Sequence, residues 1–206
     1  MILIGQYDSP FVRRVGIALR LYGMEFEHRP WSVFGDAEKI KPFNPLIRVP
    51  TLVLDDGFVL TDSMTIMDYL DGLVAAPLVP RTEPARRLVL KIVALASGLS
   101  DKAVSLFYER HLHDLASDVW EARCLGQIGG VLAALEADRA KRKTAFWFGD
   151  TLGFADIAVA CALRHAAESH PDVIDLTRFP ALAAHCETCE ALPVCKAISQ
   201  PFIFPT

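Results

Sequence analysis

Ser9 and Pro10 stand where an apolar run ends and a helical pattern begins. Residues 1–4 are continuously apolar, as expected of a strand buried on both faces. Ser is favoured just before a helix, and Pro suits the first helical position because its missing N–H needs no partner there. The helical spacing continues through Val12, Val15, Leu19 and Tyr22. A hydroxyl at a helix N-terminus can stabilise an anion such as a thiolate, or it can simply cap its own helix.

A second feature, Val49-Pro50, precedes a predicted β-hairpin. Residues 51–54 and 58–61 have strand character, and Asp-Gly in the turn between them is a strong hairpin signal. Pro50 cannot donate to a sheet, so we expect it at the start of the first strand. Because few X–Pro bonds in folded proteins are cis, the sequence alone predicts a trans bond here.

The third feature is Asp62-Ser63, which directly follows the hairpin. It heads a helical pattern formed by Met64, Met67 and Leu70. A helix N-terminus that carries a Ser hydroxyl is suited to a carboxylate. The same residues are also typical of a simple helix cap.

In this order, the three features resemble the glutathione site of the glutathione S-transferase (GST) family. The run Ser9-Pro10-Phe11-Val12-Arg13-Arg14 resembles both the Ser-type and the Cys-type active-site turns of the family, with Ser where the Cys would be, and we identify the chain as similar to Ser-type, bacterial-like members. The resemblance extends over nearly the whole chain. It implies a thioredoxin-like α/β domain of order βαβ-α-ββα, followed by an all-α domain.

The domain boundaries follow a change of character along the chain. Residues 1–76 alternate strand and helix patterns and form the predicted glutathione-binding domain. A Pro-rich linker covers 77–84, and residues 85–206 have helical patterns only. Within the last part, Gly149 to Ile157 resembles a helix-capping motif of the family, so we interpret Asp156 as a folding residue.

The resemblance assigns a role to each glutathione contact. Ser9 would donate to the thiolate, with Tyr7, two residues earlier, as the competing thiol activator. The Val49-Pro50 bond would be cis, which leaves the Val49 backbone free to pair with the cysteinyl backbone. Ser63 and its N–H would hold the γ-glutamyl carboxylate.

Further roles are implied with alternatives left open. Asp62 would help to hold the α-amino end of glutathione. Arg48 would reach the glycyl carboxylate or remain a solvated surface residue. Phe11 and Tyr108 would line an apolar electrophile pocket or belong to the core. Asp101 would reach the glutathione of the other subunit in a homodimer, or have no such role.

Composition limits the remaining possibilities. A net charge of −4 without a basic run argues against nucleic-acid binding. We find no apolar stretch long enough to span a membrane and no secretory signal, and the five cysteines are loosely spaced, which favours reduced thiols in a cytoplasm. Cys186, Cys189 and Cys195 with His185 have the composition of a metal site. However, they fall in a predicted helix, so we predict no metal.

The expected function is therefore glutathione transfer to an electrophilic small molecule. The alternatives are a non-catalytic GST-like scaffold or a glutathione-dependent peroxidase or reductase. The absence of Cys from residues 1–76 argues against a glutaredoxin-like mechanism, which needs a protein thiolate.

Overall fold

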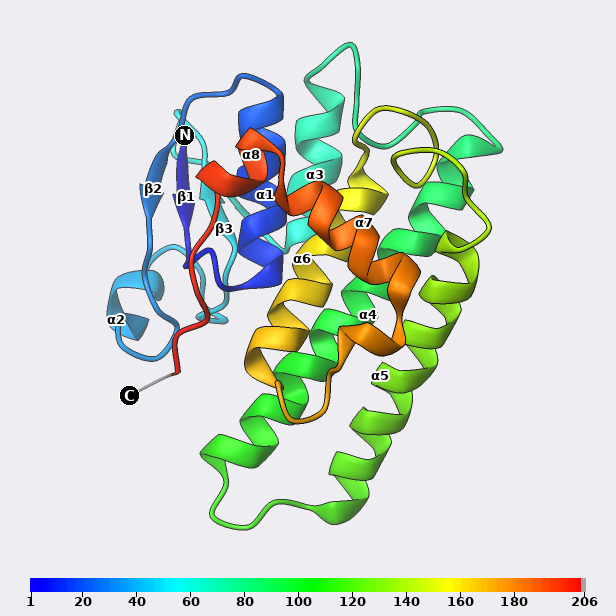
Figure 1. The fold of residues 1–206 in the computed structure, drawn as a ribbon. Helices are drawn as coiled ribbons and strands as arrows, with labels where there is room; N and C mark the ends of the chain where they lie inside the picture. Colours follow the sequence, from blue (N-terminus) through cyan, green and yellow to red (C-terminus); the bar gives the residue numbers. More distant parts are fainter. Residues whose placement is uncertain (205–206) are drawn as a thin grey trace. The chain divides into compact units, whose positions relative to one another are not determined.

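Two units make up the chain in this computed structural model, which describes residues 1–204 (Figure 1). The first unit is Met1–Leu78 together with the chain from Leu192 onward, and the second is Val79–Ala191. Within residues 1–204, no helix has both the length and the apolar character that crossing a membrane requires.

The first unit is a mixed sheet with helices. Its elements are, in chain order, β1 (Ile2–Ile4), α1 (Pro10–Leu21), β2 (Glu27–Arg29), α2 (Ala37–Ile40), β3 (Thr51–Val53), β4 (Val59–Thr61), α3 (Ser63–Gly72) and α8 (Pro193–Ala197). The sheet order is β2-β1-β3-β4, with β1 parallel to β2 and antiparallel to β3. The predicted hairpin is confirmed, since β3 pairs antiparallel with β4. The predicted βαβ-α-ββα order is therefore correct.

Gly5 lets β1, α1 and the loop before β3 approach closely. Its φ is +127°, a conformation that side chains disfavour. A Cβ at this position would lie 2.5 Å from Cγ2 of Val12 and 2.7 Å from Cβ of Val49. The first turn of α1 can therefore lie this close to the Val49-Pro50 bond only because Gly5 has no side chain.

The end of the chain departs from the predicted domain boundaries. The sequence assigned residues 85–206 to the helical domain, but the structure groups the chain from Leu192 with the first unit. The cause is Arg13, which is 2% exposed and donates from Nε to the Ile198 carbonyl at 2.8 Å and from Nη2 to the Cys195 carbonyl at 3.0 Å. Helix α8 accordingly packs on α1 (Figure 1).

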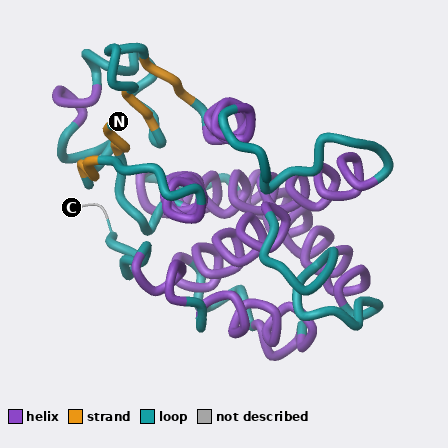
Figure 2. The backbone as a smooth tube through the Cα atoms, turned by 90° about the horizontal axis from the view of Figure 1, so that it is seen from above, coloured by secondary structure: helices purple, strands orange, loops and turns teal. Residues whose placement is uncertain are grey.

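The second unit is helical, as predicted. It contains α4 (Ala85–Leu112), α5 (Asp118–Arg139), α6 (Phe154–Ser169), a short 3-10 turn (Leu176–Arg178) and α7 (Pro180–Glu190). Helix α4 runs beside α5 and packs on α6 (Figure 1). Figure 2 shows the helices of the chain in purple and its short strands in orange. Asp156 accepts from the N–H of Gly153 at 2.8 Å and from that of Trp147 at 2.7 Å. Its predicted role at the start of α6 is confirmed.

Candidate functional site

Ser9 caps α1 with a backbone in the extended region, as its sequence context predicts. Its Oγ accepts from the Val12 N–H at a long 3.4 Å. A bond of that length contributes weakly, and it uses the oxygen only as an acceptor. The hydroxyl hydrogen can therefore donate to another group, and the side chain is partly exposed.

The Tyr7 ring lies against the middle of α1, away from the helix N-terminus where Ser9 is. The ring stacks on His28 with centroids 3.8 Å apart, and its Cε1 lies 3.0 Å from where a Cβ of Gly16 would be. Gly16 follows Ser9 by about 10 Å along the helix axis. Burial raises the pKa of Tyr7 to about 12, against a smaller lowering by Arg20. The phenol therefore lies beside the middle of α1 and remains protonated at neutral pH.

The Val49-Pro50 bond is cis, which the family resemblance implied and residue statistics alone did not. A buried amide shapes the loop before it: Asn44 Nδ2 donates to the Arg48 carbonyl at 2.9 Å and to Thr51 Oγ1 at 3.1 Å. Thr51 Oγ1 also donates to the Arg48 carbonyl, at 3.0 Å. Sequence reasoning did not identify Asn44. The Arg48 side chain is exposed, which agrees both with a contact to the glycyl carboxylate and with a solvated surface residue.

Asp62 and Ser63 form the start of α3. Asp62 has a φ of +69°, and its Oδ1 accepts from the N–H of Met64 at 2.8 Å and that of Thr65 at 3.2 Å. Ser63 is 1% exposed, and its Oγ accepts from Nη2 of Arg14. The Asp62 carboxylate therefore caps the helix, and the Ser63 hydroxyl already has a cationic neighbour.

Arg14 is a site residue that sequence reasoning did not assign. It is 3% exposed, and its guanidinium also lies over the Phe11 ring, 5.0 Å from the centroid. A buried guanidinium beside the N-terminus of α3 adds positive charge to an end that already favours anions. The signal in the sequence that could have identified Arg14 was its position directly after Arg13, on a helix face whose other residues are buried.

The N-terminal half of α1 thus connects the three predicted features of the first unit. Ser9 begins it, Val12 lies close to Val49 around Gly5, and Arg14 bonds Ser63. Phe11 is half-buried on the same helix.

Two other predicted residues, Tyr108 and Asp101, lie on α4 of the second unit. Tyr108 is 37% exposed, which excludes the core alternative for this residue, and Asp101 is also exposed.

The cysteines with metal-site composition do not form a cluster. His185 Nε2 lies 3.6 Å from Cys189 Sγ, and both residues are buried. Among residues 1–204 no group of three or more His, Cys, Asp or Glu side chains is arranged to hold a metal ion.

Comparisons with known proteins agree with this geometry. Residues 3–78 match the family model "Glutathione S-transferase, N-terminal domain", and residues 118–188 match "Glutathione S-transferase, C-terminal domain". The GST-like protein YibF of Escherichia coli is 33% identical over 80% of this chain and 81% of its own. The chain belongs to the glutathione S-transferase family.

Other relatives of this GST have functional names or bound ligands. Maleylacetoacetate isomerase of Pseudomonas aeruginosa is 30% identical over 85% of each chain. A Methylobacterium radiotolerans GST, solved with glutathione sulfonate, is 27% identical, covers 100% of this chain and 98% of its own, and has a TM-score of 0.89. A GST family member from Pseudomonas fluorescens, solved with glutathione, is 32% identical over 98% of this chain and 99% of its own, with a TM-score of 0.85.

Proposed function

We propose that this GST binds glutathione, holds it as the thiolate and directs it at an electrophilic small molecule. The observation that carries the proposal is the N-terminal half of α1, which links the Ser9 hydroxyl, the cis Val49-Pro50 bond and the Arg14–Ser63 pair. The glutathione and glutathione sulfonate held by two relatives support the same ligand class.

In this proposal, each part of the site holds one part of glutathione. The Val49 backbone pairs with the cysteinyl backbone, and the N-terminus of α3 with Ser63 receives the γ-glutamyl carboxylate. Arg14 supplies charge to that carboxylate site through Ser63. Asp62 assists the α-amino end, and the exposed Arg48 reaches the glycyl carboxylate.

The chemical step is a nucleophilic substitution. The thiol proton leaves to solvent, and Ser9 donates a hydrogen bond to the thiolate that remains. The thiolate attacks the electrophilic carbon, a C–S bond forms, and the leaving group departs with its electron pair. Each unit by which the site lowers the thiol pKa corresponds to about 1.4 kcal/mol of stabilisation.

Ser9 is favoured over Tyr7 as the thiol activator on position and charge. Ser9 lies at the positive end of α1, where an anion is stabilised. Tyr7 lies about two helical turns further along and has a raised pKa. The Tyr7 phenol therefore lies away from the positive N-terminal end of α1, where Ser9 is.

Two aromatic rings that are not fully packed are each a candidate for contact with the electrophile. Phe11 is half-buried in the first unit and Tyr108 is partly exposed in the second, so each has ring surface available. Most small-molecule sites are lined mainly by apolar and aromatic groups.

Calorimetry with glutathione, followed by turnover assays, tests the proposal. The assays use a chloro-nitroaromatic for conjugation, an organic hydroperoxide for peroxidase activity and maleylacetoacetate for isomerisation. The isomerase assay is included because one relative has that name. We expect binding and conjugation. Binding without turnover in any assay would instead indicate a scaffold, and absence of binding would refute the proposal.

A further inference from the structure

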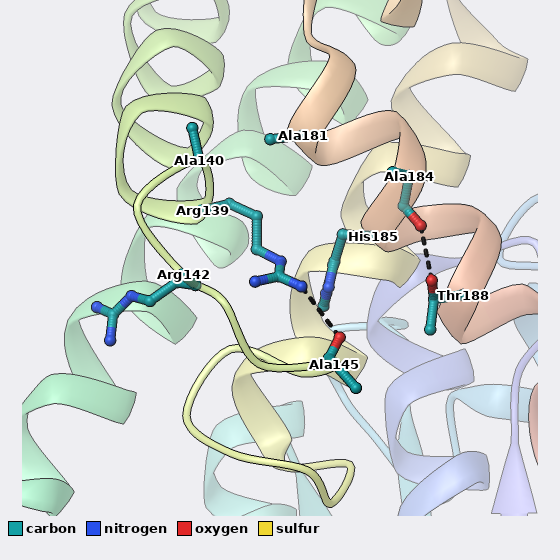
Figure 3. Close-up of a pocket in the computed structure, with 8 residues that line it drawn as sticks. All are labelled: Arg139, Ala140, Arg142, Ala145, Ala181, Ala184, His185 and Thr188. Atoms are coloured by element: carbon teal, nitrogen blue, oxygen red, sulfur yellow. Dashed lines mark hydrogen bonds between the residues drawn. The ribbon is translucent and has the colours of Figure 1, made fainter.

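The second unit contains a cavity of about 360 Å³ between the end of α5, the loop that follows and α7 (Figure 3). Arg139 and His185 are among the residues that line it, together with four alanines. However, Nε and Nη1 of Arg139 and Nδ1 of His185 are buried, so a molecule in the cavity would not reach them. Nη2 of Arg139 already donates to two carbonyls of the neighbouring loop. These two side chains therefore give the cavity no means of holding a polar ligand.

Residues 198–204, the red trace that follows α8 in Figure 1, belong to the first unit. The segment begins at a fixed point on α1, because the Ile198 carbonyl accepts from Nε of the buried Arg13 at 2.8 Å. Cγ2 of Ile198 lies 3.0 Å from the position that a Cβ of Gly16 would take, and Cε1 of Tyr7 lies 3.0 Å from the same position. The segment therefore starts against the middle of α1, beside the Tyr7 ring.

Ser9 ends a tight turn formed by residues 6–9. The Ser9 N–H donates to the Gln6 carbonyl at 3.2 Å, so Tyr7 and Asp8 are the two central residues of the turn. The Ser9 side chain itself has only the long 3.4 Å bond from the Val12 N–H. Since this bond is weak, the conformation of the turn determines where the Ser9 hydroxyl lies.

The segment after α8 binds both central residues of this turn. The Tyr7 N–H donates to Oε1 of Gln200 at 3.3 Å. Oδ2 of Asp8 accepts from the Ile203 N–H at 3.1 Å. The Asp8 carboxylate directly precedes Ser9, and its negative charge alone would disfavour a thiolate nearby. A role in holding the turn can therefore be separated from an effect of charge, because the two act on the thiol in opposite directions.

We propose that Asp8 and Gln200 are positioning residues for the thiol site. Together they join the turn before Ser9 to residues 198–204, and this fixes the Ser9 hydroxyl where it can donate to the glutathione sulfur. The inference rests on the proposed function, in which Ser9 is the thiol activator. Neither Asp8 nor Gln200 contacts the sulfur, and both act through the turn.

Hydrogen exchange of the Ile203 amide tests the contact in the absence of glutathione. Asp8→Ala removes the acceptor of the Ile203 N–H, whereas Asp8→Asn retains a side-chain oxygen that can accept it. We expect the Ile203 amide to exchange about three- to tenfold faster in Asp8→Ala than in Asp8→Asn. Equal exchange rates would show that the contact is not formed in solution and would overturn the proposal.

The pKa of the bound glutathione thiol, measured from the ultraviolet absorbance of the thiolate, tests the consequence for the site. Both Asp8 variants lose the same charge, so a difference between them reports the hydrogen bond. We expect a three- to tenfold smaller ratio of thiolate to thiol in Asp8→Ala than in Asp8→Asn, roughly half to one pKa unit. Gln200→Leu removes the acceptor of the Tyr7 N–H and should raise the thiol pKa above the wild-type value.

Asp56→Ala is the matched control for these variants. Asp56 Oδ1 also accepts from a backbone N–H, that of Phe58 at 2.9 Å, but it lies in the hairpin turn between β3 and β4, so the thiol pKa should stay at the wild-type value. With normal glutathione binding by the wild type, equal thiol pKa values in Asp8→Ala and Asp8→Asn would overturn the positioning role of Asp8. An unchanged pKa in Gln200→Leu would overturn that of Gln200. Absence of glutathione binding by the wild type would overturn the proposed function, and the positioning role with it.

Discussion

Arg14→Gln should weaken glutathione binding and leave the chemical step almost unchanged. Arg14 is 3% exposed and donates to the Ser63 hydroxyl, so the substitution removes a buried charged donor beside the proposed carboxylate site. Hydrogen bonds to charged groups contribute about 1.5–3 kcal/mol. At about 1.4 kcal/mol per decade, this predicts a 10- to 100-fold loss of affinity. Because the carboxylate contact is similar in the ground and transition states, KM should rise while kcat stays within about threefold.

The assay combines calorimetry and steady-state kinetics with a modified ligand. A glutathione analogue without the γ-glutamyl α-carboxylate should bind the wild type more weakly than glutathione, and the difference in affinity between the two ligands should be smaller in Arg14→Gln. Arg20→Gln, on the exposed end of α1, is the control for loss of one positive charge. Arg14→Lys retains the charge and provides a second variant if the Gln protein unfolds.

Two results would refute this reasoning. One is a fall in kcat at unchanged KM. The other is an equal loss of affinity for glutathione and for the analogue, since Arg14 would then act only on the fold. Absence of glutathione binding by the wild type would instead contradict the proposed function itself.

Three further predictions follow from the structure. Ser9→Ala should lower kcat by roughly 10²–10³ through loss of a donor to the thiolate, while its weak cap makes the loss of stability at most about 1 kcal/mol; full activity in this variant would contradict the assignment. His185, with its pKa lowered from 6.5 to about 4, should contribute about 3 kcal/mol of stability above pH 6.5 that is lost as the pH falls toward 4. Unfolding curves of the wild type and His185→Gln between pH 4 and 6.5 test this loss of stability, with His113→Gln as the exposed control. The raised pKa of Asp156 has the opposite effect on stability as the pH falls, and it is present in both proteins. The protein should be a homodimer, so sedimentation should give twice 22.7 kDa, and a monomer mass would exclude any role for Asp101 in a partner's site.

Local sequence was sufficient for the elements that begin or end at specific residues. Ser9-Pro10 predicted the start of α1, Asp55-Asp56-Gly57 the hairpin, and Asp62-Ser63 the start of α3. In each place, a backbone preference of one or two residues determines the conformation. The cis bond before Pro50 was implied by family resemblance and not by residue statistics.

Contacts between distant segments could not be predicted in this way. Arg14 and Ser63 are far apart in the chain, and their pairing depends on how α1 packs against α3. Arg13 draws residues 195–198 onto the first unit by binding two carbonyls, which have no side-chain signature in the sequence. The direction of Tyr7 depends on stacking with His28, which follows from the register of β1 and β2.

Titration of bound glutathione tests the central claim most directly. The thiolate absorbs in the ultraviolet, so difference spectra against pH give the pKa of the bound thiol in wild type, Ser9→Ala and Tyr7→Phe. We predict that the wild type lowers that pKa by about two units, that Tyr7→Phe preserves the shift and that Ser9→Ala removes most of it. A shift that persists in Ser9→Ala, or disappears in Tyr7→Phe, would contradict the assignment of Ser9.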